Sequence, residues 1–416
     1  MATPEEIEVL GGGPVAALAT SRLARARLAV RWLADPADTT DGGEGDVLPA
    51  ELYARLPAAD DAGADRRIVL HRWMLLDGSR WTGTEFRESG PEGLPVAVLR
   101  SELTERCARE ARELGVSPRK PEAAPPSPDP PGAPPTPAPA ARVGRSLGRL
   151  LTEPSFGEPS RRRPTTRTEW HGCLRFNLEP ARIEARFGLR PGEGATVDWL
   201  AAPDGGIVAG GSLRTYRDCL GLTLQVWGVV RPPTAADLDQ QRRRFLAHPA
   251  LAPLLAGSQL SSEVRRELRP PPADRWGGSG YLRLGRGAGL EASNGMELRG
   301  LPAELASAEI AAEVTATALR SGPRLGDRSG EYARRLRADP SYVGLADWAA
   351  RGRRLRRTAG ASAEWPRFQA ELFHRLMTEE GGPKRSVRST VMSTRRDAHL
   401  SPARLFRSAW NWWEAW

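Results

Sequence analysis

Cysteine is scarce in this chain, which has only Cys107, Cys173 and Cys219 among its 416 residues. No pair has the C-x-x-C spacing of a redox motif or zinc site. Three widely spaced cysteines also cannot build the disulfide framework of a small secreted protein. We therefore expect a reducing compartment, the cytoplasm, and no iron–sulfur cluster held by this chain alone.

Other chemistry-bearing patterns are also missing. The histidines are His71, His171, His248, His374 and His399, and no H-E-x-x-H pattern joins any two of them. His171 and Cys173 are close in sequence, but no further ligand accompanies them, so we expect no metal site. The absence of a G-x-S-x-G turn argues against a serine hydrolase. No catalytic acid, base or nucleophile can be named from these patterns.

Long apolar runs are absent as well. No stretch reaches the roughly 18–20 residues that a membrane-spanning helix needs. The N-terminus is acidic, with Glu5, Glu6 and Glu8, and lacks the pattern of a secretory signal. Both observations favour a cytoplasmic protein.

Lysine is nearly absent too, because Lys120 and Lys384 are the only two among 60 basic residues. Such heavy use of arginine is typical of a GC-rich coding sequence, so the net charge of +9 does not indicate nucleic-acid binding. Arginine runs such as 161–163 and 353–357 are expected to be solvated faces, with phosphate binding as the alternative. The Trp-rich end, residues 410–416, could contact a membrane interface, the body of the protein or a partner.

Residues 121–141 contain proline at a density that excludes both helix and sheet. We expect an extended tether here, with a ligand for a proline-binding module as the alternative. Elsewhere, periodicity predicts strands near 67–75 and 96–99, a helix over 101–115, a β-rich stretch over 168–231 and a helix beginning at Thr234.

The N-terminal segment Ile7–Ala34 carries the most informative motif. A β-branched strand runs into Gly11-Gly12-Gly13-Pro14, which is followed by an Ala-rich helix and a second strand. Gly11 permits a tight turn and Gly13 lets the backbone approach a diphosphate, while Ala16 is the third small residue of the pattern. The helix N-terminus then offers N–H groups to the phosphates. This layout predicts a dinucleotide-binding βαβ unit, with a ligand-free Gly-rich turn as the alternative.

Several phrases of the sequence follow one another in the order known from one family. They are GGGPVAALA (11–19), VLRSEL (98–103), IEARF (183–187) with GEGA (192–195), FLAHP (245–249) with LLAG (254–257), and YLRLGRGAG (281–289). In this wording and order the chain resembles the FAD-dependent oxidoreductases of the FixC and electron-transfer-flavoprotein:quinone oxidoreductase type, which are related to geranylgeranyl reductases. The resemblance spans about residues 5–352, apart from 117–168.

The resemblance implies FAD as cofactor and an α/β fold. A Rossmann-type FAD-binding domain would contain an inserted β-rich substrate domain and a disordered Pro-rich segment. The expected domains are 1–116 and 270–352 for FAD, 117–168 as linker, 169–269 for substrate, and 353–416 as an Arg/Trp-rich C-terminal region. The expected cofactor-binding residues are Gly11, Gly13, Pro14, Ala16, Asp35, Arg100, Gly285, Arg286 and Gly289.

Three positions depart from the family pattern. The acidic residue at the end of the second strand is replaced by Ala34, and Asp35 comes one residue late. The Gly-Asp pair of the second motif is here Gly285-Arg286, and arginine accepts no hydrogen bond. The Pro-rich tether stands where relatives carry an Ala-Asp-Gly phrase. These changes lead to the hypothesis that FAD binding is weakened, altered or lost.

Two functions follow from the resemblance. In the first, electrons pass through a bound flavin between a donor and an acceptor. The donor would be an electron-transfer flavoprotein or a small organic substrate, and the acceptor a quinone or ferredoxin-like protein. In the second, the chain is a cofactor-poor, non-catalytic relative that acts as a binding or scaffold subunit. Peripheral membrane contact is left open in both, and no nucleic-acid partner is expected.

Overall fold

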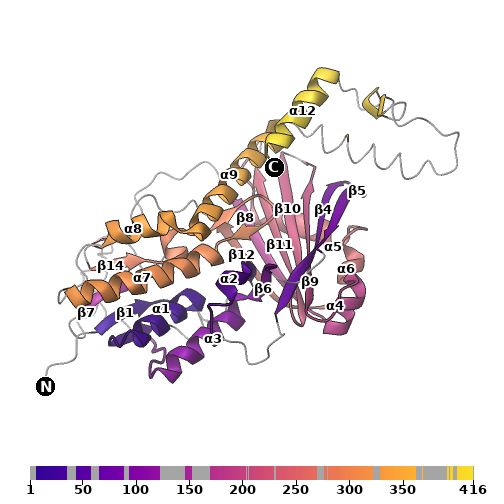
Figure 1. Cartoon of the computed structure of the whole chain (residues 1–416). Helices are drawn as coiled ribbons and strands as arrows, with labels where there is room; N and C mark the ends of the chain where they lie inside the picture. The colour runs from indigo at the N-terminus through magenta and orange to yellow at the C-terminus, as the bar shows by residue number, and fades with distance from the viewer. Residues whose placement is uncertain are drawn as a thin grey trace, which may run out of the picture.

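The computed structural model describes residues 6–34, 44–57, 65–88, 93–121, 146–151, 169–202, 204, 206–228, 231–268, 276–278, 280–321, 328–361, 368, 391–392, 394–396 and 401–415. Within these ranges the strands form a five-stranded sheet, a nine-stranded sheet and a two-stranded ribbon. Figure 1 shows the two larger sheets at opposite ends of the main body.

The five-stranded sheet has the order β13-β14-β7-β1-β2. Its strands are β1 (Glu6–Leu10), β2 (Val30–Leu33), β7 (Ser146–Leu151), β13 (Gly277–Gly278) and β14 (Tyr281–Arg283). Strands β14, β7, β1 and β2 run parallel, and Ile7 is in register with Val30. Ile7 and Val9 are fully buried, as expected for a central parallel strand covered on both faces. The predicted βαβ unit over residues 7–34 is therefore confirmed.

Strand β7 corrects the prediction that residues 117–168 are a linker throughout. It pairs with β1 on one side and β14 on the other, so it lies in the centre of the sheet. Leu150 of this strand is fully buried. Residues 146–151 contain no proline and can donate every ladder hydrogen bond, but six residues beside a low-complexity stretch carry little periodic signal. The Pro-rich residues 122–145 lie outside the described part of the chain.

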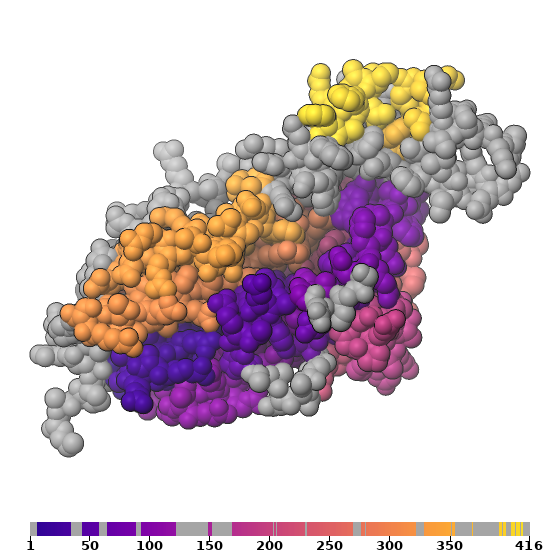
Figure 2. Space-filling view, in the orientation of Figure 1, coloured from indigo at the N-terminus to yellow at the C-terminus, as the bar shows by residue number. Residues whose placement is uncertain are grey.

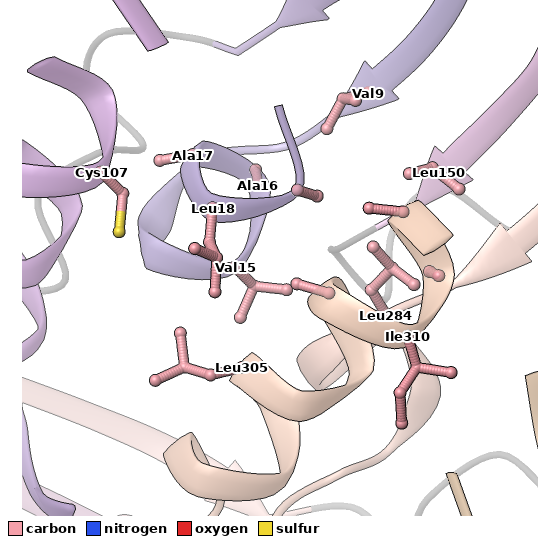
Figure 3. Close-up of a cluster of buried hydrophobic side chains, with 14 of the residues drawn as sticks. Val9, Val15, Ala16, Ala17, Leu18, Cys107, Leu150, Leu284, Leu305 and Ile310 are labelled. Carbon is pink, nitrogen blue, oxygen red and sulfur yellow. The ribbon is translucent and has the colours of Figure 1, made fainter. Parts of the chain in front are cut away.

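Four helices surround this sheet. They are α1 (Gly13–Arg25), α3 (Arg100–Glu113), α7 (Leu301–Ser321) and α8 (Ser329–Ala338). Helix α1 packs against both α3 and α7. Figure 3 shows Val15 and Leu18 of α1 facing Leu284 and Leu305, which belong to the same buried cluster although they lie far along the chain. Segments from both ends of the sequence thus share one core.

The nine-stranded sheet has the order β12-β8-β11-β10-β9-β4-β6-β3, and β5 pairs with β4. Its strands are β3 (Gly45–Leu48), β4 (Arg66–Asp77), β5 (Arg80–Arg87), β6 (Val96–Leu99), β8 (Glu169–Asn177), β9 (Glu193–Ala201), β10 (Ile207–Thr215), β11 (Cys219–Gly228) and β12 (Gln259–Leu268). β4 pairs in parallel with β9. Strands β3, β4, β5 and β6 therefore join the β-rich sheet, which differs from the predicted boundary that placed all of 1–116 in the FAD domain. Local periodicity shows that a strand exists, but tertiary packing decides which sheet it joins.

One face of this sheet is covered by short helices. They are α4 (Pro180–Phe187), α5 (Ala235–Leu246) and α6 (Ala252–Leu255). The predicted start of α5 is confirmed by a capping box, in which Thr234 Oγ1 accepts from the Asp237 N–H at 3.3 Å and Asp237 Oδ2 accepts from the Thr234 N–H at 2.7 Å. Phe245 of α5 packs edge-on against Trp199 of β9, with 5.7 Å between the ring centroids.

The remaining elements lie where the two sheets meet or toward the C-terminus. They are α2 (Ala50–Tyr53), α9 (Pro340–Ala361), α12 (Pro402–Ala415), the 3-10 turn η2 (Gly285–Ala288), β15 (Ala292–Ser293) and β16 (Leu298–Arg299). Figure 2 shows α12, in yellow, at the opposite end of the molecule from the indigo N-terminal segment. Among the helices of the described residues, none combines the length and the apolar character needed to cross a bilayer. Cys107, Cys173 and Cys219 are buried, and within the described part of the chain none of them forms a disulfide.

Candidate functional site

The Gly-rich turn after β1 has the backbone geometry that a diphosphate site needs. Gly11 and Gly13 adopt φ values of +114° and +74°, in the left-handed region that other residues avoid. The Gly11 N–H donates to the Leu33 carbonyl at 2.9 Å and holds the turn against β2. Helix α1 begins at Gly13 without a side-chain cap, and no acidic residue occupies its first turn. Its first N–H groups and its positive dipole end therefore suit an anionic ligand.

Pro14 and Ala16 shape the first turn of α1. Pro14 occupies one of the first two helical positions, where its missing N–H costs nothing. Ala16 is fully buried, so the small side chain that the motif requires is used for packing. The backbone half of the site is thus built as the motif predicts, and it fits the diphosphate of a dinucleotide.

The end of β2 offers less to a cofactor. Ala34 is buried, and its N–H donates to the Arg119 carbonyl at 3.0 Å. A methyl side chain at this position accepts no hydrogen bond from a ribose hydroxyl. Asp35, the acidic residue expected to serve instead, lies outside the described residues.

The second motif lies directly against α1. Gly285 has φ of +53°, and a Cβ added to it would lie 3.1 Å from Cγ2 of Val15 in the first turn of α1. Its N–H donates to Ser307 Oγ of α7 at 3.0 Å. Gly289 ends the turn with φ of +72°. The two glycines therefore serve close packing and backbone direction, and they bring residue 286 near the start of α1.

Arg286 belongs to a four-residue ion-pair network, here called the Glu44 cluster and made of Glu44, Arg266, Arg286 and Glu291. Arg286 pairs with Glu44 and lies 3.4 Å from Glu291. Arg266 lies 2.5 Å from Glu291 and 3.2 Å from Glu44. Burial alone would raise the pKa of the Glu44 carboxyl, but Arg286 and Arg266 outweigh it and hold this pKa well below its usual range. The cluster joins β3, β12 and η2.

Arg100, the other arginine expected at the cofactor, makes a buried two-point ion pair within the protein. Its Nη1 and Nη2 donate to Glu304 of α7 at 3.0 and 2.6 Å. The side chains are 6% and 1% exposed, so both charges depend on this pair for compensation. The bond links the first turn of α3 to the first turn of α7.

The N-terminus of α7 is capped by a carboxylate from β3. Asp46 Oδ2 accepts from the N–H groups of Gly300 and Leu301 at 3.2 and 2.9 Å, and Asp46 is 2% exposed. A negative charge here is stabilised by the positive end of the helix dipole. Two acidic residues of one short segment, Glu44 and Asp46, thus tie β3 to the second motif and to α7.

A small cavity of about 20 Å³ lies among these groups, with room for roughly one water molecule. His171 lines it, and neither ring nitrogen of His171 has a hydrogen-bond partner among the described residues. Burial, with Arg266 acting in the same direction, lowers the pKa of His171 to about 4. His171 is therefore neutral at pH 7. The other residues at this cavity include Arg100, Arg286, Arg299 and Gly300.

A much larger cavity of about 590 Å³ shares Arg299 and Gly300 with the small one. This volume lies within the usual range of small-molecule sites. It opens between the N-terminus of α7, β4 of the large sheet and α9, and its wall combines apolar and polar groups. Its lining residues include Val47, Ile68, His71, Arg214, Leu345 and Trp348.

The polar floor of this large cavity is organised around one carboxylate. Glu297 pairs with Arg214 and, at 2.9 Å, with Arg299. The Arg299 guanidinium lies over the Trp348 ring, 3.8 Å from its centroid. Burial lowers the pKa of His71, so this ring is also neutral at pH 7. The cavity can hold a flat or apolar molecule and offer it hydrogen-bond donors.

Sequence reasoning missed Glu44, Asp46 and every residue of the large cavity. Each is ordinary in its local context, and each acquires its partners from segments far away in the chain. The one local signal is the pair of acidic residues beside Gly45, just before a strand. Among the described residues, no three His, Cys, Asp or Glu side chains gather as metal ligands do.

No protein-family model matches the chain. Among curated proteins, FixC of Escherichia coli K12 is 32% identical over 169 residues, which cover 40% of this chain and 39% of FixC. The probable electron transfer flavoprotein-quinone oxidoreductase YdiS of the same strain is 26% identical over 221 residues, covering 52% of this chain and 51% of YdiS. The chain thus aligns with about two fifths to one half of the length of these relatives. The resemblance to FixC-type proteins is confirmed.

Among solved structures, a geranylgeranyl bacteriochlorophyll reductase-like protein of Thermoplasma acidophilum superposes with a TM-score of 0.59. The two chains are 13% identical, and the match covers 95% of this chain and 97% of the other. At this identity the match establishes the fold. The predicted α/β fold, a Rossmann-type domain joined to a β-rich domain, is confirmed.

Proposed function

We propose that the chain is an FAD-dependent oxidoreductase of the FixC type. Electrons would pass through the flavin between a donor and an acceptor. The donor would be an electron-transfer flavoprotein or a small organic substrate, and the acceptor a quinone or a ferredoxin-like protein. The observation that supports this most is the Gly11–Gly13 turn, an uncapped helix N-terminus in the backbone geometry of a diphosphate site.

The flavin, when bound, supplies the redox chemistry, and the protein binds, orients and shields it. The Gly11–Gly13 turn would hold the diphosphate through backbone N–H groups. Gly285 and Gly289 would let the second motif approach closely. The large cavity beside Arg299 and Trp348 would receive the ring and a small organic partner, away from bulk water. The proposed cofactor contacts are Gly11, Gly13, Pro14, Ala16, Asp35, Arg100, Gly285, Arg286 and Gly289.

A second candidate function is that of a cofactor-poor scaffold subunit. The Glu44 cluster favours it, because Arg286 is paired with Glu44 at a position where relatives carry an acceptor for the cofactor. Arg100 is likewise engaged with Glu304. Such a subunit would keep the fold and its surfaces without performing redox chemistry.

The proposed location is the cytoplasm, with α12 as a candidate contact to a membrane surface. Phe406 and Trp410 lie one helical turn apart and are 69% and 54% exposed. Their rings stack with 6.2 Å between centroids, which gives α12 an apolar patch beside exposed Arg407.

Oxidoreductase activity can be tested on purified protein equilibrated with excess FAD under anaerobic conditions. Reduced electron-transfer flavoprotein is added, and reduction of a water-soluble quinone is followed by absorption. The proposal predicts quinone reduction that is faster with the unaltered protein than with Gly13→Ala protein at the same FAD concentration. Rates equal to those of free FAD alone, in the presence of a folded protein, would favour the scaffold function.

A further inference from the structure

The second motif connects the start of α1 to two adjoining cavities. Gly285 packs on Val15 at the start of α1, and the next residue, Arg286, lines the small cavity. The small and large cavities meet at Arg299 and Gly300. A dinucleotide whose diphosphate lies at the Gly11–Gly13 turn must pass Arg286 and the small cavity to place its second half in the large cavity.

This path is closed by the Glu44 cluster. The cavity left beside Arg286 holds about 20 Å³, roughly one water molecule, which is far too small for a sugar-alcohol chain. Glu44 is 6% exposed and is shared between Arg286 and Arg266. Asp46, two residues later, is fastened to the N-terminus of α7. Buried polar contacts therefore fix both ends of the segment Glu44–Asp46 between the second motif and α7.

We infer that the segment Glu44–Asp46 is an internal latch that must open before a complete FAD can occupy the site. The inference rests on the proposed function. In the closed arrangement the passage toward the large cavity is shut, whereas ADP needs only the Gly11–Gly13 turn. Opening requires Glu44 to leave Arg286, whose guanidinium then becomes available to the cofactor's diphosphate.

The latch lowers the apparent affinity for FAD but not for ADP. A ligand that binds only the open form has its affinity reduced by the fraction of molecules that are open. Separating a buried ion pair is strongly unfavourable, so this fraction is small. Since ADP lacks the part that crosses the latch, the ratio of FAD to ADP affinity reports its state directly.

The test compares ADP and FAD binding, by calorimetry and by flavin fluorescence, in the unaltered chain and in Glu44→Gln protein. Glutamine keeps the volume of glutamate and removes the charge that ties Arg286 and Arg266. We expect FAD to bind at least about tenfold more tightly to the variant, with ADP affinity changed less than about twofold.

Glu44→Gln leaves one buried positive charge without compensation and could fold poorly. The double variant Glu44→Gln/Arg266→Gln removes one charge of each sign, keeps Arg286 beside Glu291, and should show the same gain in FAD affinity. Glu263→Gln is the matched control, because Glu263 is also shared by two arginines, Arg242 and Arg265, on the opposite face of β12 from Arg266.

Three results would overturn the latch, and they are distinguishable. Equal FAD affinity in the unaltered chain and both Glu44 variants means that the path is already open. A gain of the same size in Glu263→Gln protein means that the effect is one of overall charge. Binding of ADP without FAD in every variant means that something other than the latch excludes the flavin, and then the proposed function fails as well.

Discussion

The two halves of the candidate site differ in the groups that they present: backbone N–H groups at the start of α1, and charged side chains around the second motif. At the start of α1, Gly11 and Gly13 offer backbone N–H groups and positive φ angles, and no acidic side chain occupies the first turn. Around the second motif the site contains charged side chains that pair with one another, in the Glu44 cluster and in the Arg100–Glu304 pair. The backbone half has the geometry of a diphosphate site, whereas the side-chain half is filled by ion pairs within the protein.

The two halves also differ in how closely they are bound to the fold. A Gly-rich turn is part of the βαβ core, so altering it disturbs β1, α1 and β2 together. Side chains beyond the turn can exchange a ligand for one another without changing the fold. Arg286, Glu44, Arg100 and Glu304 satisfy one another's charges in this way within the candidate site.

The largest effect is expected where the side-chain half is most buried. Glu304→Ala leaves the Arg100 guanidinium without its carboxylate in a buried position and should lower the free energy of unfolding by about 3–5 kcal/mol. Urea denaturation measures this change. Glu331→Ala is the control, because its pair with Arg328 is 3.7 Å long and partly exposed, and its loss should cost less than about 1 kcal/mol. Equal effects would show that the Arg100–Glu304 pair does not hold the two helices.

The next largest effect is a dependence of the free energy of unfolding on pH, which arises from His171 in the side-chain half. His171 has its pKa lowered to about 4, whereas an unfolded histidine titrates near pH 6.5, so the unfolded chain binds the proton first as the pH falls. Stability should therefore drop by roughly 3 kcal/mol between pH 6.5 and 4, and the contribution of His171 to this loss should be complete below pH 4.

Urea denaturation at several pH values, in the unaltered chain and in His171→Leu protein, tests this dependence. The variant should lose the slope between pH 6.5 and 4. The variant should keep the loss of stability at lower pH, where Glu44 takes up its proton. A carboxyl whose pKa is lowered by folding stabilises the fold above its unfolded pKa. This stabilisation is lost as the pH falls through the folded pKa. A slope unchanged in His171→Leu protein would assign it to another group.

The smallest effect on stability, with the sharpest effect on binding, is expected in the backbone half. Gly13→Ala places a side chain at φ of +74°, which costs about 1–2 kcal/mol. The new methyl group also meets the approaching diphosphate, so ADP affinity should fall by about tenfold to a hundredfold. Gly78→Ala is the matched control, since Gly78 has φ of +62° and nothing within 4 Å of an added Cβ.

The Gly78 variant should lose similar stability and no ADP affinity, as measured by calorimetry. Loss of ADP binding in both variants would trace the effect to general destabilisation. Retention of ADP binding in Gly13→Ala protein would remove the Gly11–Gly13 turn from the site.

Local patterns predicted much of the fold. The strand, turn and helix at residues 7–34, the helix over residues 101–115, and the helix beginning at Thr234 with its capping box all follow from periodicity and capping over short windows. The same windows could not reveal β7, whose six residues are recognisable as a strand only between β1 and β14. Nor could they show that strands β3, β4, β5 and β6 join the β-rich sheet.

The candidate site likewise has a part that could be predicted from the sequence and a part that could not. Gly11 and Gly13 were predictable because their role depends on the backbone of a single turn. The partner of Arg286 was not, since Glu44 lies 242 residues away in the chain and is brought near only by the packing of β3 beside η2. The replacement of aspartate by Arg286 did signal an altered contact. What replaced that contact depended on the tertiary structure.

Equilibrium dialysis against FAD would show whether this chain holds FAD through the Gly11–Gly13 turn. Visible absorption measures the FAD retained on the protein side, with and without excess ADP. The account predicts retained flavin that ADP displaces, with less retained by Gly13→Ala protein than by Gly78→Ala protein. Absence of retained FAD both in the unaltered chain and in Glu44→Gln protein, at concentrations where ADP binds, or retained flavin that ADP does not displace, would contradict it.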